Sequence, residues 1–199
     1  MALDNADSWK YFKKLTIQDS ENASADYQIK LTVYAGSGTD DPNDGIVYCD
    51  NHCEDFPNDI RFGTTNNPKT AEQLPQWIEE YDDNSATIWI KLPSDGNNII
   101  YMFVGNPSAS FYSDGDEVFI FFDDFEGPLD SNKWTTIQGS ISTSDGKLEL
   151  EGTTGTKGLI ESKTTFSAGV AIEVYAKANS ENQDSQHICS LRKPGDWNY

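Results

Sequence analysis

The stretch YQIKLTVY, residues 27–34, decides the fold class. Its apolar residues recur at every second position: Tyr27, Ile29, Leu31 and Val33. Because successive side chains of a strand point to opposite faces, this period of two predicts a half-buried β-strand. ATIWIKL, 86–92, repeats the pattern, and IIYMFV, 99–104, is apolar throughout, which is typical of a central strand covered on both faces.

Similar patterns predict further strands along the chain. They lie in KKLTIQ (13–18), EVFIFF (117–122), KLELE (147–151), GLIES (158–162) and GVAIEVYAKA (169–178). AEQLPQWIEEY, 71–81, is expected to hold a helical turn, which Pro75 limits. Ten Phe, nine Tyr and five Trp residues add to a β-rich composition. The sequence therefore predicts an all-β fold of two antiparallel β-sandwich modules with a jelly-roll-like arrangement, residues 1–115 and 116–199.

The chain is strongly acidic, with 14 basic against 33 acidic residues and a formal net charge of -19. Such a surface argues against nucleic acid and anionic membranes as partners, because no basic stripe is available to displace phosphate counterions. It suits a saline or calcium-containing exterior. No apolar run is long enough to span a bilayer, so no membrane insertion is expected.

The cysteines of YCDNHCEDF, Cys49 and Cys53, are close enough in sequence to close a small disulfide loop. Two alternatives stay open, free thiols and a zinc site that adds His52, although three ligands within five residues crowd one another. The third cysteine, Cys189, is expected to be a small core residue.

The acids of FFDDFEGPLDSNKW, 121–134, are the first candidates for catalysis. Asp123 and Asp124 are neighbours and would point to opposite faces of a strand, so we expect a structural role for them, with Glu126, ahead of calcium binding or catalysis. Familiar nucleophile, phosphate and zinc-protease motifs are missing, which predicts a protein that is not an enzyme.

Three further binding or modification sites are predicted. TDDPNDG, 39–45, offers hard oxygen ligands for calcium, although a solvated acidic turn explains it as well: Asp40, Asp41, Asn43 and Asp44. Trp89, with Trp77, could stack on sugar rings, because Trp89 lies on the strand face opposite Ile88 and Ile90. Asn22, in NAS, is the acceptable N-glycosylation sequon.

Six motifs between residues 8 and 112 carry a family resemblance: WKYFKKLTI, DYQIKLTV, DFPNDIRF, LPQWIEEY, ATIWIKLP and IIYMFVGNP. In order and spacing they resemble a domain of unknown function that recurs in large archaeal and bacterial cell-surface proteins and in proteins related to the MotA/TolQ/ExbB proton channels. The start MALDNADSWKYF lacks a secretion signal, and the resemblance, with the cysteines, favours an extracellular protein whose leader has been removed over a cytoplasmic one.

The next segment, FFDDFEGPLDSNKWTTIQGSISTSDGKLELEG, resembles the opening of a concanavalin A-like or laminin G-like jelly roll. The resemblance implies that Phe122, Phe125 and Trp134 are packing anchors. Such a sandwich needs about twice the sequence that follows residue 115, so the second module is expected to be incomplete, with an apolar face covered by the first module, by missing sequence or by another copy.

These observations favour a non-catalytic extracellular surface module for carbohydrate binding, adhesion or cell-envelope attachment, with glycans or envelope proteins as partners. One alternative is a structural subunit of a surface layer, filament or virus-like assembly, a homo-oligomer completed by neighbouring chains. Another is a fragment of a glycan-active enzyme.

Overall fold

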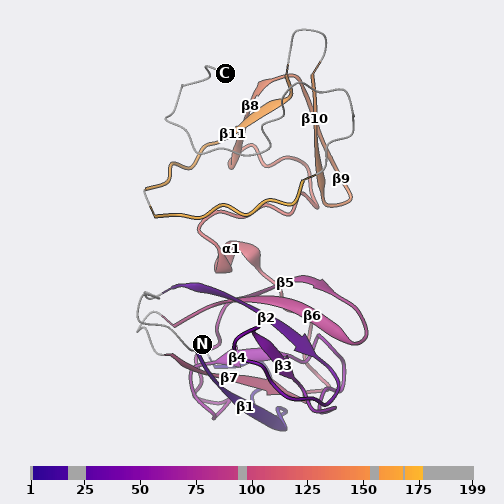
Figure 1. Ribbon diagram of the computed structural model, residues 1–199, viewed down its shortest axis with the longest axis vertical. Coiled ribbons are helices and arrows are strands. Elements are labelled where there is room, and N and C mark those ends of the chain that lie inside the picture. Colours follow the sequence, from indigo (N-terminus) through magenta and orange to yellow (C-terminus); the bar gives the residue numbers. More distant parts are fainter. Residues whose placement is uncertain (1, 18–25, 94–97, 153–156, 168, 177–199) are drawn as a thin grey trace. The chain divides into compact units, whose positions relative to one another are not determined.

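The computed structural model describes residues 2–17, 26–93, 98–152, 157–167 and 169–176 (Figure 1). Asn22 and Cys189 lie outside these ranges, as do the last two residues of the strand predicted at 169–178. The chain divides into two compact units: Met1–Gly127 with Thr143–Lys147, and Pro128–Ser142 with Leu148–Tyr199. The first unit thus extends beyond residue 115, where the sequence predicts a domain boundary.

The first unit is a β-sandwich of two sheets, which confirms the all-β prediction (Figure 1). One sheet has the order β1-β7-β4, formed by Tyr11–Thr16, Ile99–Val104 and Arg61–Gly63. The other has the order β3-β2-β6-β5, formed by Ile46–Tyr48, Gln28–Tyr34, Ser85–Lys91 and Gln76–Tyr81. Neighbouring strands are antiparallel except for β2 and β3, which are parallel.

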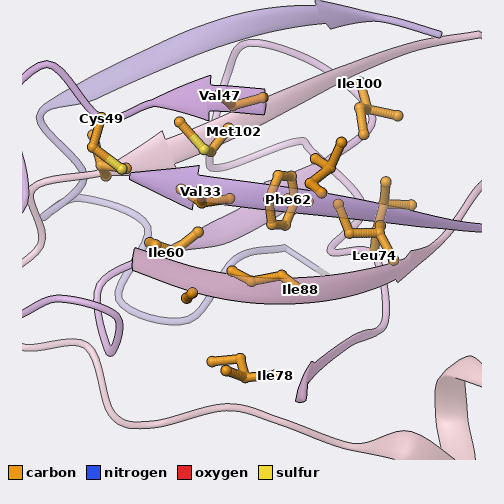
Figure 2. Packing of buried hydrophobic residues seen from close by; sticks show 14 of the residues in the cluster. Val33, Val47, Cys49, Ile60, Phe62, Leu74, Ile78, Ile88, Ile100 and Met102 are labelled. Atoms are coloured by element: carbon orange, nitrogen blue, oxygen red, sulfur yellow. The ribbon is translucent and has the colours of Figure 1, made fainter. Parts of the chain in front are cut away.

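The core lies between the two sheets and follows the period-two patterns (Figure 2). In the antiparallel pairing of β2 with β6, Leu31 lies opposite Ile88 and Val33 lies opposite Ala86. These four side chains belong to one buried cluster, to which β7 contributes Ile100 and Met102. Each large apolar side chain buried in this way stabilises the fold by about 1.5 to 3 kcal/mol. The predictions for 27–34 and 86–92 are confirmed.

Strand β7 is covered on both faces, as its continuous apolar run predicts. Ile100 and Met102 face the main core, whereas Phe103 points to the other side and is 1% exposed. There it packs against Leu3 and, edge to face, against Trp9. The N-terminal segment therefore covers part of the outer face of this sheet.

Two element predictions in the first unit are wrong. Residues 76–81 form strand β5 and no helical turn, because pairing with β6 gives its backbone groups their partners. Residues 115–118 form the short helix α1, and no strand follows at 119–122. The Asp114 carboxylate accepts a hydrogen bond from the Glu117 backbone N–H and so caps this helix.

The remaining strands form two pairs among the described residues. β8 (Trp134–Gln138) pairs antiparallel with β11 (Leu159–Ser162), and β9 (Ser140–Ser144) pairs with β10 (Lys147–Glu151). The strands predicted in KLELE and GLIES are confirmed. The strand predicted at 169–178 is wrong over its described part, since 171–176 form no strand and none of the strands described pairs with them. No helix in the described ranges is long and apolar enough to cross a membrane.

Candidate functional site

A cavity of about 290 Å³ lies at one edge of the first sandwich, and we call it the edge pocket. Its walls come from β1, from the end of β3 with the turn that follows, and from β7. The lining residues are Lys10, Tyr11, Phe12, Lys13, Tyr48, Cys49, Asp50, His52, Met102 and Val104. The edge pocket therefore combines aromatic, cationic and acidic side chains above the end of the apolar core.

A tight turn after β3 forms one wall of the edge pocket. Asp50 and Asn51 have φ angles of 56° and 61°, and the His52 N–H donates to the Cys49 carbonyl over 3.0 Å. Positive φ at both central positions is the requirement of a type I′ turn, and Asp and Asn tolerate it better than most residues. The backbone N–H groups of Asp50 and Asn51 donate to carbonyls of Gly36 and Ala35, which anchors the turn to the end of β2.

The turn places the His52 ring against Tyr11 of β1. The two rings are stacked, with centroids 3.9 Å apart and an angle of 11° between their planes. Tyr11 is 44% exposed, so its ring remains available to a ligand. Gly105, at φ +81°, permits this approach, because a Cβ there would lie 2.9 Å from the His52 carbonyl and 3.0 Å from the Tyr11 ring.

Charged groups complete the polar wall of the edge pocket. The Lys13 ammonium contacts the carboxylates of Asp40 at 3.1 Å and Asp50 at 3.0 Å, and it donates to the Tyr48 carbonyl over 2.6 Å. Partial burial lowers the pKa of Lys13, but its hydrogen bonds to Asp50 and Asp40 outweigh burial and leave the pKa raised. A positive charge is therefore held between two carboxylates at the pocket wall.

The predicted calcium loop lies beside this wall. Asp40 accepts from Lys13 and from the Tyr48 backbone N–H at 2.8 Å, while Asp41 accepts from the Asn43 backbone N–H at 2.9 Å. Within the described ranges, no group of three or more His, Cys, Asp or Glu side chains could hold a metal ion. That statement also applies to the zinc alternative at Cys49, His52 and Cys53. Calcium binding by Asp40, Asp41, Asn43 and Asp44 stays a prediction.

The two predicted sugar-stacking residues, Trp77 and Trp89, belong to an aromatic cluster on the outer face of β5 and β6. Phe119 packs edge to face on both indoles, with centroids 5.7 Å from Trp77 and 5.3 Å from Trp89. Phe122 contacts Trp77 at 4.7 Å, and Lys30 lies over the Trp89 ring. Both indoles therefore have partners within the chain. The carbohydrate role of Trp77 and Trp89 stays a prediction.

The acids of residues 123–126 serve the local backbone. The Asp123 carboxylate accepts from the Phe125 N–H at 2.9 Å, and the Asp124 carboxylate accepts from the Glu126 N–H at 3.2 Å. Phe125 has φ of 56°, so these side-chain bonds support a turn directly after the segment 117–122, where the sequence predicts a strand.

Cys49 and Cys53 carry free thiols in this structure. Cys49 is 2% exposed, and the half-buried Cys53 packs against the core cluster to which Cys49 belongs. The turn at Asp50 and Asn51 separates the two cysteines in sequence. Formation of the disulfide stays a prediction, as does glycosylation of Asn22.

In the comparison with known proteins, one family model matches part of the chain. Residues 56–137 match a domain of unknown function (DUF2341). The matched stretch includes β4 to β7, α1 and all of β8 except its last residue, and it overlaps the segment whose motifs resemble such a domain. No curated protein and no solved structure matches the chain.

The sequence reasoning missed Tyr11 and Lys13 as site residues, and it considered His52 only as a zinc ligand. The available signal was Asp50-Asn51 in YCDNHC, because an Asp-Asn pair between a strand and a polar segment favours a turn with positive φ. The turn packs against β1, which is far away in sequence, and no local sequence pattern predicts this contact.

Proposed function

We propose that the protein is a non-catalytic extracellular surface module that binds carbohydrate through the edge pocket. The observation that carries this proposal is the stacked pair of Tyr11 and His52 beside the wall formed by Lys13 and Asp50. A sugar ring has an apolar C–H face that packs on an aromatic ring, and hydroxyl groups that pair with ammonium and carboxylate groups. The edge pocket offers both kinds of partner.

The size of the edge pocket supports a small ligand or the end of a longer one. Its volume of about 290 Å³ lies at the lower limit of small-molecule sites. One terminal sugar unit of a glycan chain fits a cavity of this size. The glycans would belong to a cell envelope or to a neighbouring cell.

The charges of the edge pocket favour binding without catalysis. A glycoside hydrolase needs one protonated carboxyl group that can donate to the leaving oxygen. Here the carboxylates of Asp40 and Asp50 both bond to the Lys13 ammonium. This arrangement suits the recognition of hydroxyl groups rather than proton transfer to a leaving group.

Location at a cell surface is supported by the acidic surface of the chain and by its resemblance to domains of cell-surface and MotA/TolQ/ExbB-related proteins. The resemblance of residues after 120 to a concanavalin A-like opening supports the same reading. Envelope proteins would then be the neighbours of the module, and sugar binding would serve adhesion or attachment.

The test is a glycan array with the parent chain, followed by calorimetry on the best ligand. Tyr11→Ala should weaken binding about tenfold, because the stacking partner of the sugar is lost. The control is Tyr27→Ala, which removes a Tyr that is 51% exposed and lies outside the edge pocket. Equal affinities of the two variants would reject the edge pocket as the site.

A second candidate function is a subunit of a surface assembly, and the apolar side chains of the second unit favour it. Several of them are at least one third exposed: Ile137, Leu150, Ile172, Val174 and Tyr175. Light scattering across a range of concentrations tests this candidate. It predicts oligomers that Val174→Lys disrupts, whereas a monomer at every concentration would reject it.

A further inference from the structure

Two cysteines lie on either side of the turn that follows β3, and a buried carboxylate bonds to the backbone next to the second one. Cys49 belongs to the buried core cluster (Figure 2). Cys53, which follows the turn, packs against that cluster. The left-handed residues Asp50 and Asn51 reverse the chain between them. Both thiols therefore lie at the same core cluster, with this turn between them in sequence.

The carboxylate belongs to Asp59, which is completely buried. Its Oδ2 accepts from the backbone N–H groups of Glu54 at 2.6 Å and Gly105 at 3.1 Å. Its Oδ1 is buried and has no hydrogen-bond partner in the described part of the chain. A buried carboxylate oxygen without such a partner is costly, and buried polar groups of this kind occur at reactive sites.

We propose that Cys49 and Cys53 form a reversible disulfide by exchange with a low-molecular-mass disulfide, and that the buried carboxylate of Asp59 controls the reactivity of Cys53. Cys53 is the more exposed of the two thiols and is the one that an incoming reagent meets. This proposal does not depend on what the edge pocket binds.

The exchange runs in two steps. The Cys53 thiolate attacks one sulfur of the reagent disulfide, so that a mixed disulfide forms and one reagent thiolate leaves. The Cys49 thiolate then attacks Cys53 Sγ, which closes the Cys49–Cys53 bond and expels the second reagent thiolate. The two cysteines lose two protons and two electrons, and the reagent disulfide is reduced to two thiols.

Asp59 slows the first step because only the thiolate attacks. Contact with the Cys49 sulfur, burial and the negative charge of Asp59 raise the pKa of Cys53. The neighbouring charges are otherwise engaged, since the Glu54 carboxylate is paired with Lys10 and the His52 ring is stacked on Tyr11. Removing the charge of Asp59 should therefore make Cys53 more reactive.

The experiment uses the full chain with Cys189→Ser, so that only this thiol pair reacts with oxidised glutathione. Intact mass should show a slow loss of two hydrogens with no lasting glutathione adduct. Asp59→Asn keeps an oxygen for the Glu54 and Gly105 N–H groups and should react about tenfold faster at neutral pH. Asp55→Asn, which removes an exposed carboxylate nearby, should react at the parent rate.

A persistent glutathione adduct on the parent would contradict disulfide closure. An Asp59→Asn rate equal to or below the parent rate would contradict control by Asp59. A second measurement needs no Asp59 variant. In a chain with Cys49→Ser and Cys189→Ser, the rate at which iodoacetamide alkylates Cys53 is measured as the pH is raised. This rate should keep rising at pH values above the ordinary thiol pKa of about 8.5. A plateau below that pH would overturn the proposal.

Discussion

Single residues decide the geometry of the edge pocket. Asp50 and Asn51 supply the positive φ angles that turn the chain, and Gly105 supplies the space in which His52 and Tyr11 meet. The Asp-Asn pair was readable as a turn from the sequence, because these residues favour left-handed backbone. The need for glycine at 105 was not readable, since the atoms that would clash with a side chain come from β1 and from the turn after β3.

Gly105→Ala tests this geometry. Alanine would be forced to φ +81° with its Cβ 2.9 Å from the His52 carbonyl, so we expect a loss of about 1 to 3 kcal/mol in the free energy of unfolding. Urea unfolding measures the change. The matched control is Gly36→Ala, because a Cβ at Gly36 meets nothing within 4 Å. Equal stability of the two variants would contradict the close approach described at Gly105.

The pH dependence of stability reports on Cys53. Its pKa is raised in the folded protein by the Cys49 sulfur, by burial and by Asp59, so the folded state holds this proton more tightly than the unfolded state. The contribution is fully present below the ordinary thiol pKa of about 8.5 and is lost as pH rises above it. In the presence of a reductant, the free energy of unfolding should therefore fall at alkaline pH.

Cys53→Ser is the control for this prediction, and its stability should fall less steeply over the same range. Tyr112, whose pKa is raised by burial and by its hydrogen bond to Glu117, adds a further fall above about pH 10 in both chains. Identical slopes for the parent and Cys53→Ser between about pH 8.5 and 10 would contradict the account of Cys53.

At the scale of elements, the hydrophobic period predicts long strands well and capped or unpaired segments poorly. The strands at 28–34 and 85–91 have one buried face, which their alternating apolar residues predict. The strand at 99–104 is buried on both faces, which its continuous apolar run predicts. EVFIFF looks like a strand, but Asp114 caps a helical turn there, and Phe119 and Phe122 pack on Trp77. The pattern at 169–178 predicts a strand that has no described neighbour to pair with.

The cap of α1 can be tested by Asp114→Ala. Losing the hydrogen bond to the Glu117 N–H should reduce stability by about 1 kcal/mol. It should also change the Trp fluorescence, because Phe119 and Phe122 follow the helix and pack on Trp77. Asp114→Asn keeps a capping oxygen and should behave almost like the parent. A change of the same size in both variants would show that the capping bond is not what stabilises this segment.

At the scale of the whole molecule, the net charge of -19 is the dominant sequence property. Its consequence is self-repulsion that salt relieves, because the Debye length shortens to about 8 Å at physiological ionic strength. The sequence predicts this effect without a structure. It does not predict which carboxylates are already paired, as Asp40 and Asp50 are with Lys13 across two sheets.

Thermal melts separate screening from a specific calcium site. Because Asp40 bonds to Lys13 and to the Tyr48 N–H, we expect sodium, magnesium and calcium chlorides at matched ionic strength to raise the melting temperature equally. An extra rise with calcium that Asp41→Asn and Asp44→Asn abolish would contradict this expectation. It would support the prediction that the loop at 39–45 is a calcium site.

The central claim is that ligand binds in the edge pocket and not on the Trp77 and Trp89 cluster. NMR shift perturbation tests it directly: the glycan selected on the array is titrated into labelled protein while the His52 and Tyr11 ring signals and the indole N–H signals are followed. The account predicts that the His52 and Tyr11 signals move and that the Trp77 and Trp89 signals stay in place. Movement of the indole signals with the His52 and Tyr11 signals unchanged would contradict it.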